Sequence, residues 1–594
     1  MQAKRGWGNA TDTIQKTRRI PVIKRLWGYV IGGKWLLLLA LVLTIGSNVL
    51  ALAGPKLSGN AIDALAGGKG MVDFPAVYYY VLLMLGFYIL SSLLSLVLSR
   101  LMIRLTQQIV VRLRGDVFEH ISRLPVSFFD RHQSGDIISH ITYDIDTLAA
   151  SLSSDVITVS TSVITVVGSL VMMLTICPLL VAVFAVTVPL SMLFTRFMSR
   201  KVRPLFRKRS RALGEMNGFV EEMASGLNTI KAYNREEYAD ERFMSHNSDA
   251  CQSYYEADYY ACMTGPGVNF INNLSLSLIS CFGALMFLSG GISLGNLSSF
   301  VLYSRKFSGP INETANILSE MQSALAAAER VFRLLDEKEE EKDSEGAEMP
   351  EKLRGSVAFD NVSFGYLKSK IVLHNVCLDI PAGSVTAIVG ATGAGKTTLV
   401  NLLMRFYDPN SGAVLMDERD LRALPRAELR KSYTMVLQDT WLFEGTVINN
   451  LRYGKPDASL EEVENACRRA RIDSFIRSLP SGYDTVLSED GANISRGQKQ
   501  LLCIARAMLG KKKMLILDEA TSNVDIRTEK LIQDAMAELM RGKTCFVIAH
   551  RLSTIVGADR ILVMKDGDVV ESGTHAELMK AGGTYSELYR AQFA

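Results

Sequence analysis

Residues 384–398 read SVTAIVGATGAGKTT, and this stretch decides the fold of the C-terminal part of the chain. Residues 384–389 are apolar and rich in β-branched side chains, as in a buried strand, and the glycine-rich run 390–398 follows directly. Glycines in such a loop let backbone N–H groups surround phosphate oxygens, and the positive end of the next helix attracts the same anions. The stretch therefore predicts a strand, a phosphate-binding loop and a helix.

The loop residues are candidate nucleotide ligands. Lys396 can reach the β and γ oxygens of a nucleotide, and the hydroxyl of Thr397 can hold Mg²⁺. The complete set is Gly390, Ala391, Thr392, Gly393, Ala394, Gly395, Lys396, Thr397 and Thr398.

A second apolar run, residues 513–517, ends in two acids, Asp518 and Glu519. Asp518 can bind Mg²⁺ through water, and Glu519 can polarise the water that attacks a phosphate. Two acids after a strand are also common at turns. The catalytic interpretation of this pair therefore depends on the phosphate loop found in the same domain. Short β-branched runs alternate with helical ones throughout residues 351–594, which predicts an α/β domain with parallel strands.

Four long stretches without a charged residue precede this domain, at residues 35–55, 74–99, 156–195 and 259–304. As a helix, the first covers about 31 Å, the thickness of a bilayer's hydrocarbon core. Pro178 and the turn at 289–291 divide the last two stretches. We therefore predict six spans, at about 35–55, 74–99, 156–176, 178–195, 259–288 and 292–314, in preference to core helices of a soluble protein.

The distribution of charge predicts how these spans are oriented. Basic residues gather before the first span and again at 196–211, so both termini are expected in the cytoplasm of a multi-pass protein of the cell membrane. The connections 100–155 and 196–258 are too long for structureless loops and predict helices that extend beyond the bilayer.

An acidic run separates the two parts of the chain. Residues 336–350 are highly charged and read as a linker, which gives a membrane domain at 1–335 and a soluble domain at 351–594. The eight cysteines form no C-x-x-C pair and no zinc spacing, so neither a disulfide framework nor a cysteine metal site is indicated. The positive charge is scattered, which argues against a nucleic-acid partner.

The order and spacing of further motifs resemble the nucleotide-binding domain of ABC transporters. Tyr366 in SFGY (363–366) resembles the aromatic residue that stacks on adenine, and Gln438 in VLQDT (436–440) matches the loop that senses the γ-phosphate. The run ISRGQ (494–498) stands where LSGGQ is expected, SNVD (522–525) resembles the D-loop, and His550 matches the switch histidine.

This resemblance implies ATP and Mg²⁺ as cofactors. It implies nucleotide contacts from Tyr366, the phosphate loop, Ser495, Gly497 and Gln498, metal contacts from Thr397, Gln438 and Asp518, and catalysis by Glu519, His550 and Gln438. The signature departs from the family pattern, because Ile494 replaces leucine and Arg496 replaces a glycine. The Arg496 side chain either points away from the opposite nucleotide or adds a positive charge beside it.

The resemblance extends over the membrane part. Residues 124–130 (LPVSFFD) with 133–136 (QSGD), and residues 225–236, look like the coupling-helix regions of exporter-type half-transporters, with plain solvated helices as the alternative. The chain as a whole is therefore similar to an exporter half-transporter of the multidrug or lipid type: a six-span helical membrane domain followed by an α/β nucleotide-binding domain.

The resemblance also implies how such a chain works. Two nucleotide-binding domains clamp ATP head to tail, so a second half-transporter is the expected partner, within membrane lipid. The complete Walker half-site resembles the catalytically intact subunit of bacterial heterodimeric exporters, which favours a heterodimer over a homodimer. The expected activity is ATP-driven export of amphipathic small molecules, drugs, lipids or peptides by alternating access. An importer on the same fold and a soluble-type ABC ATPase are the alternatives.

Two cations fall within the last predicted span. Arg305 and Lys306 lie near mid-membrane, where a charge costs about 2.5–3.5 kcal/mol and usually faces a cavity or a partner. We expect them to line the translocation path and to favour anionic or amphipathic cargo. Pairing with an acid such as Glu313, or snorkelling, is the alternative.

Overall fold

The chain divides into two compact units in the computed structural model. One unit comprises Met1–Arg123 and His132–Lys338, and the other comprises Leu124–Arg131 and Glu339–Ala594. The structure describes residues 19–66, 72–343, 348–350, 353–367, 369–437, 440–488, 491, 493–518, 525–549 and 555–593.

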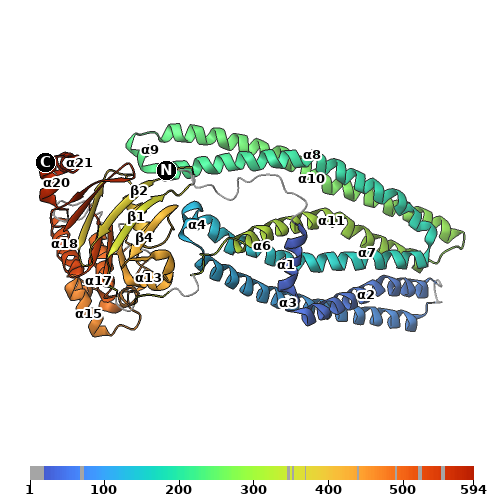
Figure 1. Cartoon of the computed structure of the whole chain (residues 1–594). Helices are drawn as coiled ribbons and strands as arrows, with labels where there is room; N and C mark the ends of the chain where they lie inside the picture. The colour runs from blue at the N-terminus through green and yellow to red at the C-terminus, as the bar shows by residue number, and fades with distance from the viewer. Residues whose placement is uncertain are drawn as a thin grey trace. The chain divides into compact units, whose positions relative to one another are not determined.

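The first unit is helical (Figure 1). Its principal helices are α1 (Arg19–Ile31), α2 (Lys34–Leu65), α3 (Phe74–Ser122), α7 (Val156–Ile176), α8 (Pro178–Ser225), α10 (Glu236–Leu288) and α11 (Leu294–Leu335). Shorter segments α5 (Ser134–Ser139), η3 (His140–Asp144), α6 (Ile145–Ala150) and η4 (Ser151–Asp155) lead into α7, and α9 (Leu227–Ala232) joins α8 to α10. Cys177, in extended conformation, separates α7 from α8.

Within the described residues, five helical stretches are long and apolar enough to cross a membrane: Lys34–Leu65, Phe74–Ser122, Ser134–Ile176, Pro178–Ser225 and Glu236–Leu288. The sixth predicted span, 292–314, overlaps the start of α11, which is not among these five and carries Arg305 and Lys306, so that span stays a prediction. The 53 residues of α10 extend over about 80 Å, far more than a bilayer requires. Long helical extensions beyond the spans are thus present.

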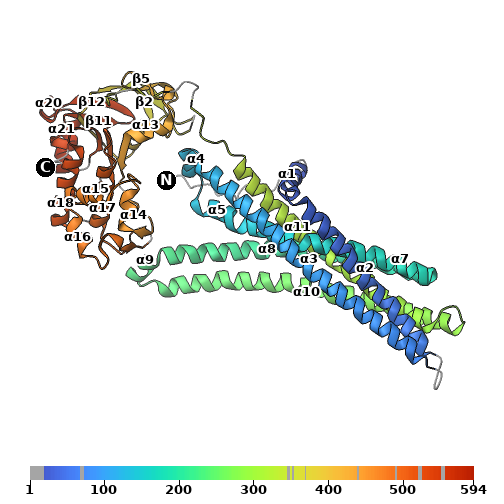
Figure 2. The same ribbon diagram turned by 90° about the horizontal axis from the view of Figure 1, so that it is seen from below.

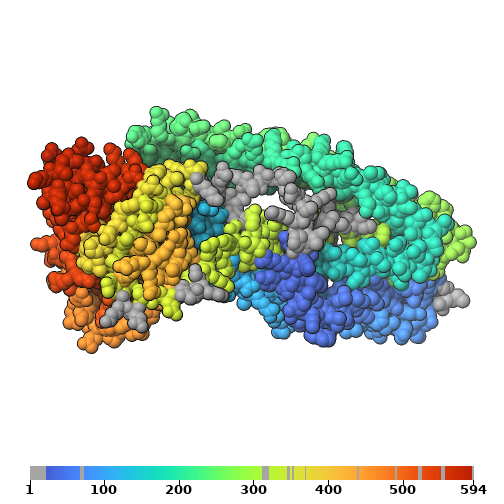
Figure 3. All heavy atoms as spheres, in the orientation of Figure 1, coloured from blue at the N-terminus to red at the C-terminus, as the bar shows by residue number. Residues whose placement is uncertain are grey.

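The helices of this unit pack as pairs. α2 lies along α3, and α8 lies along α10 over most of their length, as both ribbon views show (Figure 2). Figure 3 shows the side chains of α2 and α3, at the blue end of the colour bar, forming one continuous surface. A buried cluster that includes Leu52, Met173, Phe300 and Tyr303 joins α11 to α2 and α7.

Polar contacts fix α11 against α2. Ser299 and Tyr303 donate hydrogen bonds to the carbonyl oxygens of Pro55 (2.9 Å) and Leu52 (2.6 Å). The Lys306 ammonium donates to the carbonyl oxygen of Ala51 at 2.9 Å, while Arg305 is exposed. The Lys306 charge is therefore engaged by the backbone of α2, an arrangement that neither of the sequence interpretations of this residue included.

The second unit is an α/β domain with two principal sheets. Strands β1 (Val357–Phe364), β2 (Leu373–Ile380), β4 (Ser411–Met416) and β5 (Arg419–Asp420) form an antiparallel sheet in the order β2-β1-β4-β5. The larger sheet has the order β12-β11-β3-β10-β9-β6, from β12 (Asp568–Gly573), β11 (Arg560–Lys565), β3 (Val385–Gly390), β10 (Thr544–Ile548), β9 (Met514–Asp518) and β6 (Tyr433–Val436). Its strands are parallel except for β12 at the edge.

Helices and short elements connect the strands of this unit. They are α12 (Lys396–Leu403), α13 (Arg426–Ser432), α14 (Val447–Arg452), α15 (Leu460–Arg469), α16 (Asp473–Ser478), α17 (Arg496–Leu509), α18 (Ile526–Met540), α20 (His575–Ala581) and α21 (Thr584–Phe593), with the short pair β7 (Gly445–Thr446) and β8 (Val486–Leu487) and the turns η5 (Leu421–Ala423) and η6 (Gly482–Asp484). The six-residue helix α4 (Val126–Arg131) belongs to the same unit. Alternate residues of β10 and β3 enter two separate hydrophobic cores. A helical membrane part followed by an α/β domain confirms the predicted fold class.

Candidate nucleotide-binding site

The carboxyl ends of four adjacent parallel strands meet at one edge of the large sheet. Ile548 near the end of β10 pairs with Ile388 of β3 on one side and with Asp518 of β9 on the other, and β6 pairs with β9. The glycine-rich loop leaves β3 at this edge, and Asp518 is the last residue of β9. Open α/β sheets bind their ligands beyond the carboxyl ends of the strands, so this edge is the candidate site.

The loop has the backbone conformation that its glycines permit. Gly393 and Gly395 have φ values of +87° and +102°, and Gly395 is the residue directly before α12. A Cβ atom at Gly395 would also lie 2.8 Å from the Leu373 side chain. The loop can therefore turn sharply into the helix only with glycine at this position.

Lys396 is held inside the loop. Its Nζ donates hydrogen bonds to the carbonyl oxygens of Gly390 (2.7 Å) and Ala391 (3.0 Å). Burial lowers the pKa of Lys396, and the negative charge of Asp518 partly opposes this shift. The ammonium group thus lies between the backbone loop and the acidic end of β9, where it can meet phosphate oxygens.

Oxygen donors at this edge fit Mg²⁺. Magnesium prefers a few carboxylate or hydroxyl ligands together with water and substrate phosphates, and Thr397 and Asp518 offer one hydroxyl and one carboxylate. Among the described residues no group of three or more His, Cys, Asp or Glu side chains could hold a metal by itself. A Mg²⁺ site that is completed by nucleotide phosphates and water does not require such a group of protein side chains.

Tyr366 lies against the helix that follows the loop. Its hydroxyl donates to Oγ1 of Thr398 (3.2 Å) and accepts from the Asn401 amide (3.1 Å), both on α12. The side chain is 36 % exposed, so the ring stays accessible. The structure therefore brings this predicted adenine-stacking residue next to the phosphate loop.

The signature segment forms the N-terminus of α17. Ser495 is the capping residue: its Oγ accepts from the Gln498 backbone N–H (3.3 Å), and the Gln498 side chain accepts from the Ser495 backbone N–H (2.9 Å). Gly497 is buried, whereas Ser495 and Arg496 are exposed. Arg496 is thus exposed at the first turn of the helix.

Three predicted residues, Gln438, Glu519 and His550, lie outside the described residues. The described chain stops at Leu437, Asp518 and Ala549, each at or just beyond the end of one of the parallel strands.

Sequence reasoning missed two residues at this site, Asn401 and Tyr407. Asn401 bonds Tyr366 from α12, and the Tyr407 ring meets the Tyr366 ring edge-on with centroids 5.0 Å apart. The only sequence signal for Tyr407 is an aromatic pair directly after the predicted helix, in the run 405–409 (RFYDP).

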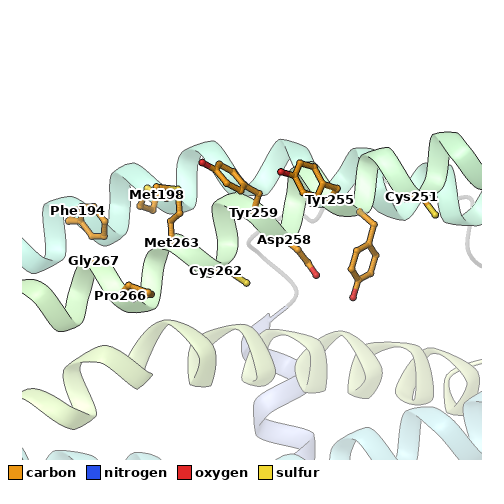
Figure 4. A pocket seen from close by; sticks show the side chains of 11 residues that line it. Phe194, Met198, Cys251, Tyr255, Asp258, Tyr259, Cys262, Met263, Pro266 and Gly267 are labelled. Atoms are coloured by element: carbon orange, nitrogen blue, oxygen red, sulfur yellow. The ribbon is translucent and has the colours of Figure 1, made fainter.

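The membrane unit contains a separate apolar pocket of about 890 Å³ between α8 and α10. Figure 4 shows its side chains along the two helices. Asp258 in its lining pairs with Arg209 (2.8 Å), whose guanidinium also stacks on Tyr254 at 3.9 Å from the ring centroid. The pocket is lined by Phe194, Met198, Cys251, Tyr254, Tyr255, Asp258, Tyr259, Cys262, Met263, Pro266 and Gly267.

Comparison with known families places both parts of the chain. Residues 37–311 match the ABC transporter transmembrane region, and residues 373–522 match the ABC transporter family model.

Relatives match over nearly the full length. An uncharacterized ABC transporter ATP-binding protein of Bacillus subtilis is 43% identical over 571 residues, covering 96% of this chain and 94% of that protein. A fatty acid ABC transporter ATP-binding/permease protein of Mycobacterium bovis is 45% identical over 550 residues, covering 92% and 87%. An ATP-dependent lipid A-core flippase of Photobacterium profundum is 33% identical over 591 residues, covering 98% and 99%.

A solved structure agrees with the fold. A bacterial Atm1-family ABC exporter with ATP bound superposes with a TM-score of 0.78 at 28% identity, covering 94% of this chain and 98% of that one.

Proposed function

The chain belongs to the ABC transporters, in the exporter group that fuses one membrane region to one ATPase domain, and on this premise we propose that it exports amphipathic molecules across the cell membrane. It is a multi-pass membrane protein that hydrolyses ATP to drive transport. One observation carries the proposal: the glycine-rich loop after β3 and the carboxylate of Asp518 lie at one sheet edge, in a chain whose other unit has membrane-length helices.

We assign the chemistry to the predicted residues. Lys396 and the loop N–H groups bind the phosphates, Thr397, Gln438 and Asp518 hold Mg²⁺, and Tyr366 stacks on adenine. Glu519 orients and activates the attacking water, and His550 contacts the γ-phosphate. The lysine position, the carboxylate at the end of β9 and the Tyr366 contacts with α12 support this assignment.

ABC exporters work as dimers, and the finer question is which partner this chain takes. In our proposal Ser495, Gly497 and Gln498 complete the site of an opposite domain, and that domain belongs to a different half-transporter. The Arg496 in place of the expected glycine supports this, because the signature of this chain departs from the family pattern while its own Walker half-site keeps Lys396 and Glu519.

We propose that the pocket between α8 and α10 receives the apolar part of the cargo. Tyrosine, methionine and phenylalanine side chains line it, and exposed basic residues continue along α8 from Arg196 to Arg211. An apolar pocket beside cations suits an amphipathic molecule with an anionic group. The relatives named for fatty acids and for lipid A-core support cargo of this class.

The orientation and the boundaries complete the proposal. Both termini face the cytoplasm, as the basic residues before α2 and along α8 suggest. The membrane domain comprises residues 1–335, the linker 336–350 and the nucleotide-binding domain 351–594.

Transport into inside-out vesicles tests the function. Vesicles that contain the full chain, with a candidate partner where one is available, receive Mg-ATP outside and a fluorescent fatty acid as probe. Uptake that requires ATP and is lost in Glu519→Gln supports export. ATP-dependent loss of probe from preloaded inside-out vesicles would show import and contradict the proposal.

A further inference from the structure

Tyr407 of the ATPase domain is hydrogen-bonded to helix α4. The hydroxyl of Tyr407 donates a hydrogen bond to the carboxylate of Asp130, which lies on α4. Phe128 on α4 and Leu124 just before this helix are buried, with 6 % and 7 % of their surface exposed. Burial and the bond to Asp130 raise the pKa of Tyr407, so its hydroxyl keeps its proton and acts as a donor.

The ring of Tyr407 belongs to a cluster of three aromatic side chains. It meets Tyr366 edge-on at 5.0 Å and Phe364 at 5.5 Å, and Phe364 meets Tyr366 edge-on at 5.1 Å. Phe364 is 3 % exposed and therefore fixed in the core, whereas Tyr366 is partly open to solvent. Among the described residues, Tyr407 is thus one of two rings that meet Tyr366 and set its orientation.

The far end of Tyr366 is tied to the phosphate-loop helix. Its hydroxyl bonds Thr398 and Asn401 of α12, the helix that begins with Lys396. An unbroken series of contacts therefore runs from Asp130 through Tyr407 and Tyr366 to α12. Its members are far apart in sequence: Asp130 and Tyr407 are separated by 277 positions.

We propose that Tyr407 is a positioning residue that orients Tyr366 for adenine. Through Tyr407, the affinity for ATP depends on whether α4 is bound to the ATPase domain. When Asp130 holds the Tyr407 hydroxyl, the ring packs against the edge of Tyr366 and keeps its face open to adenine. When α4 withdraws, the Tyr407 ring loses this hydrogen bond and no longer holds Tyr366 in place. Because linkage is reciprocal, bound ATP strengthens the binding of α4 to the ATPase domain by the same factor.

This inference rests on the proposed role of Tyr366, and its test uses the full-length protein in lipid nanodiscs. Tyr407→Phe keeps the ring and removes the hydroxyl, and Asp130→Ala removes the acceptor. We expect each to raise the KM for ATP about three- to tenfold while kcat changes less than twofold. The double variant should resemble either single one, because both remove the same bond.

Inorganic tripolyphosphate provides a readout that general damage would not spare. It binds the phosphate loop without adenine, so its inhibition constant should stay unchanged in Tyr407→Phe. Equal weakening of tripolyphosphate and ATP would mean that the substitution merely disturbs the loop, and an unchanged KM for ATP would mean that no link exists. Either result overturns the inference.

Tyr366→Leu separates the two proposals. If Tyr366→Leu raises the KM for ATP but Tyr407→Phe does not, adenine stacking stands and the link through Tyr407 is wrong. If Tyr366→Leu leaves the KM unchanged, the proposed role of Tyr366 fails, and the inference fails with it.

Discussion

Lys306 of α11 replaces a backbone donor that α2 lacks. Its Nζ donates to the carbonyl oxygen of Ala51, four residues before Pro55, at 2.9 Å. Proline has no N–H, so in a regular helix the Ala51 carbonyl would have no partner at this position. The lysine therefore satisfies a backbone group inside a predicted span, where water is scarce.

The first prediction follows from this bond. Lys306→Met leaves the Ala51 carbonyl without its donor and should lower the stability of the protein by about 1–2 kcal/mol. Thermal unfolding in detergent measures the loss, and Arg305→Met, which changes an exposed neighbour, should have almost no effect. In a Pro55→Ala background the backbone N–H returns, so the cost of Lys306→Met should shrink. A transport defect in Lys306→Met without any loss of stability would instead favour a direct role in cargo binding.

The second prediction concerns a close approach of the same two helices. A Cβ atom at Gly59 would overlap the backbone of Gly295 and the hydroxyl of Ser299, so Gly59→Ala must push α2 and α11 apart. Overpacking of this kind costs about 1–3 kcal/mol. Gly86→Ala is the matched control, because a Cβ atom there has no neighbour within 4 Å and the added methyl favours the helix. Similar unfolding temperatures for the two variants would show that the helices are not in tight contact.

The phosphate loop could be predicted from the sequence because its chemistry is local. Gly393, Gly395 and Lys396 stand next to one another, and their spacing alone specifies the turn and the helix start. The membrane-length helices were predictable for the same reason, since an uncharged run needs no distant partner.

Contacts between distant segments could not be predicted in this way. The hydrogen bond from Lys306 to Ala51 joins residues 255 positions apart, and the bond from Tyr407 to Asp130 joins residues 277 positions apart. Composition and spacing indicated that Lys306 was unusual in a span, but its partner is a backbone carbonyl that becomes available only because of Pro55. Neither the proline nor the lysine alone predicts the bond.

The third prediction uses the pKa of Lys396, which burial lowers. A lowered pKa means that the folded protein loses this proton at a lower pH than an unfolded chain does. The affinity for Mg-ATP should therefore fall as the pH rises through the lowered pKa, because binding needs the ammonium form. The free energy of unfolding should change in the opposite direction and rise over the interval up to the ordinary lysine pKa, since the unfolded state holds more protons there.

Lys396→Met shows how much of the pH dependence of Mg-ATP affinity and of the free energy of unfolding comes from this lysine. Titrations of ATP binding and of chemical unfolding from neutral pH up to the ordinary lysine pKa of about 10.4 should both lose the Lys396 contribution in the variant. If the wild type and the variant show parallel curves for both quantities, the lysine does not titrate in this range and the prediction is wrong.

The last prediction separates binding from hydrolysis at the end of β9. Asp518 and Lys396 lie at the same sheet edge, so nucleotide binding should depend on them, whereas Glu519 is expected to act only on the attacking water. Glu519→Gln should keep the affinity for Mg-ATP within about threefold and lower kcat by roughly 10²–10⁴, the usual contribution of a general base. Lys396→Ala should instead lose most of the binding. Binding of a fluorescent ATP analogue and single-turnover hydrolysis measure the two effects separately. A Glu519→Gln protein that still turns over ATP within tenfold of the wild-type rate would show that another group activates the water, and the role assigned to Glu519 would have to be withdrawn.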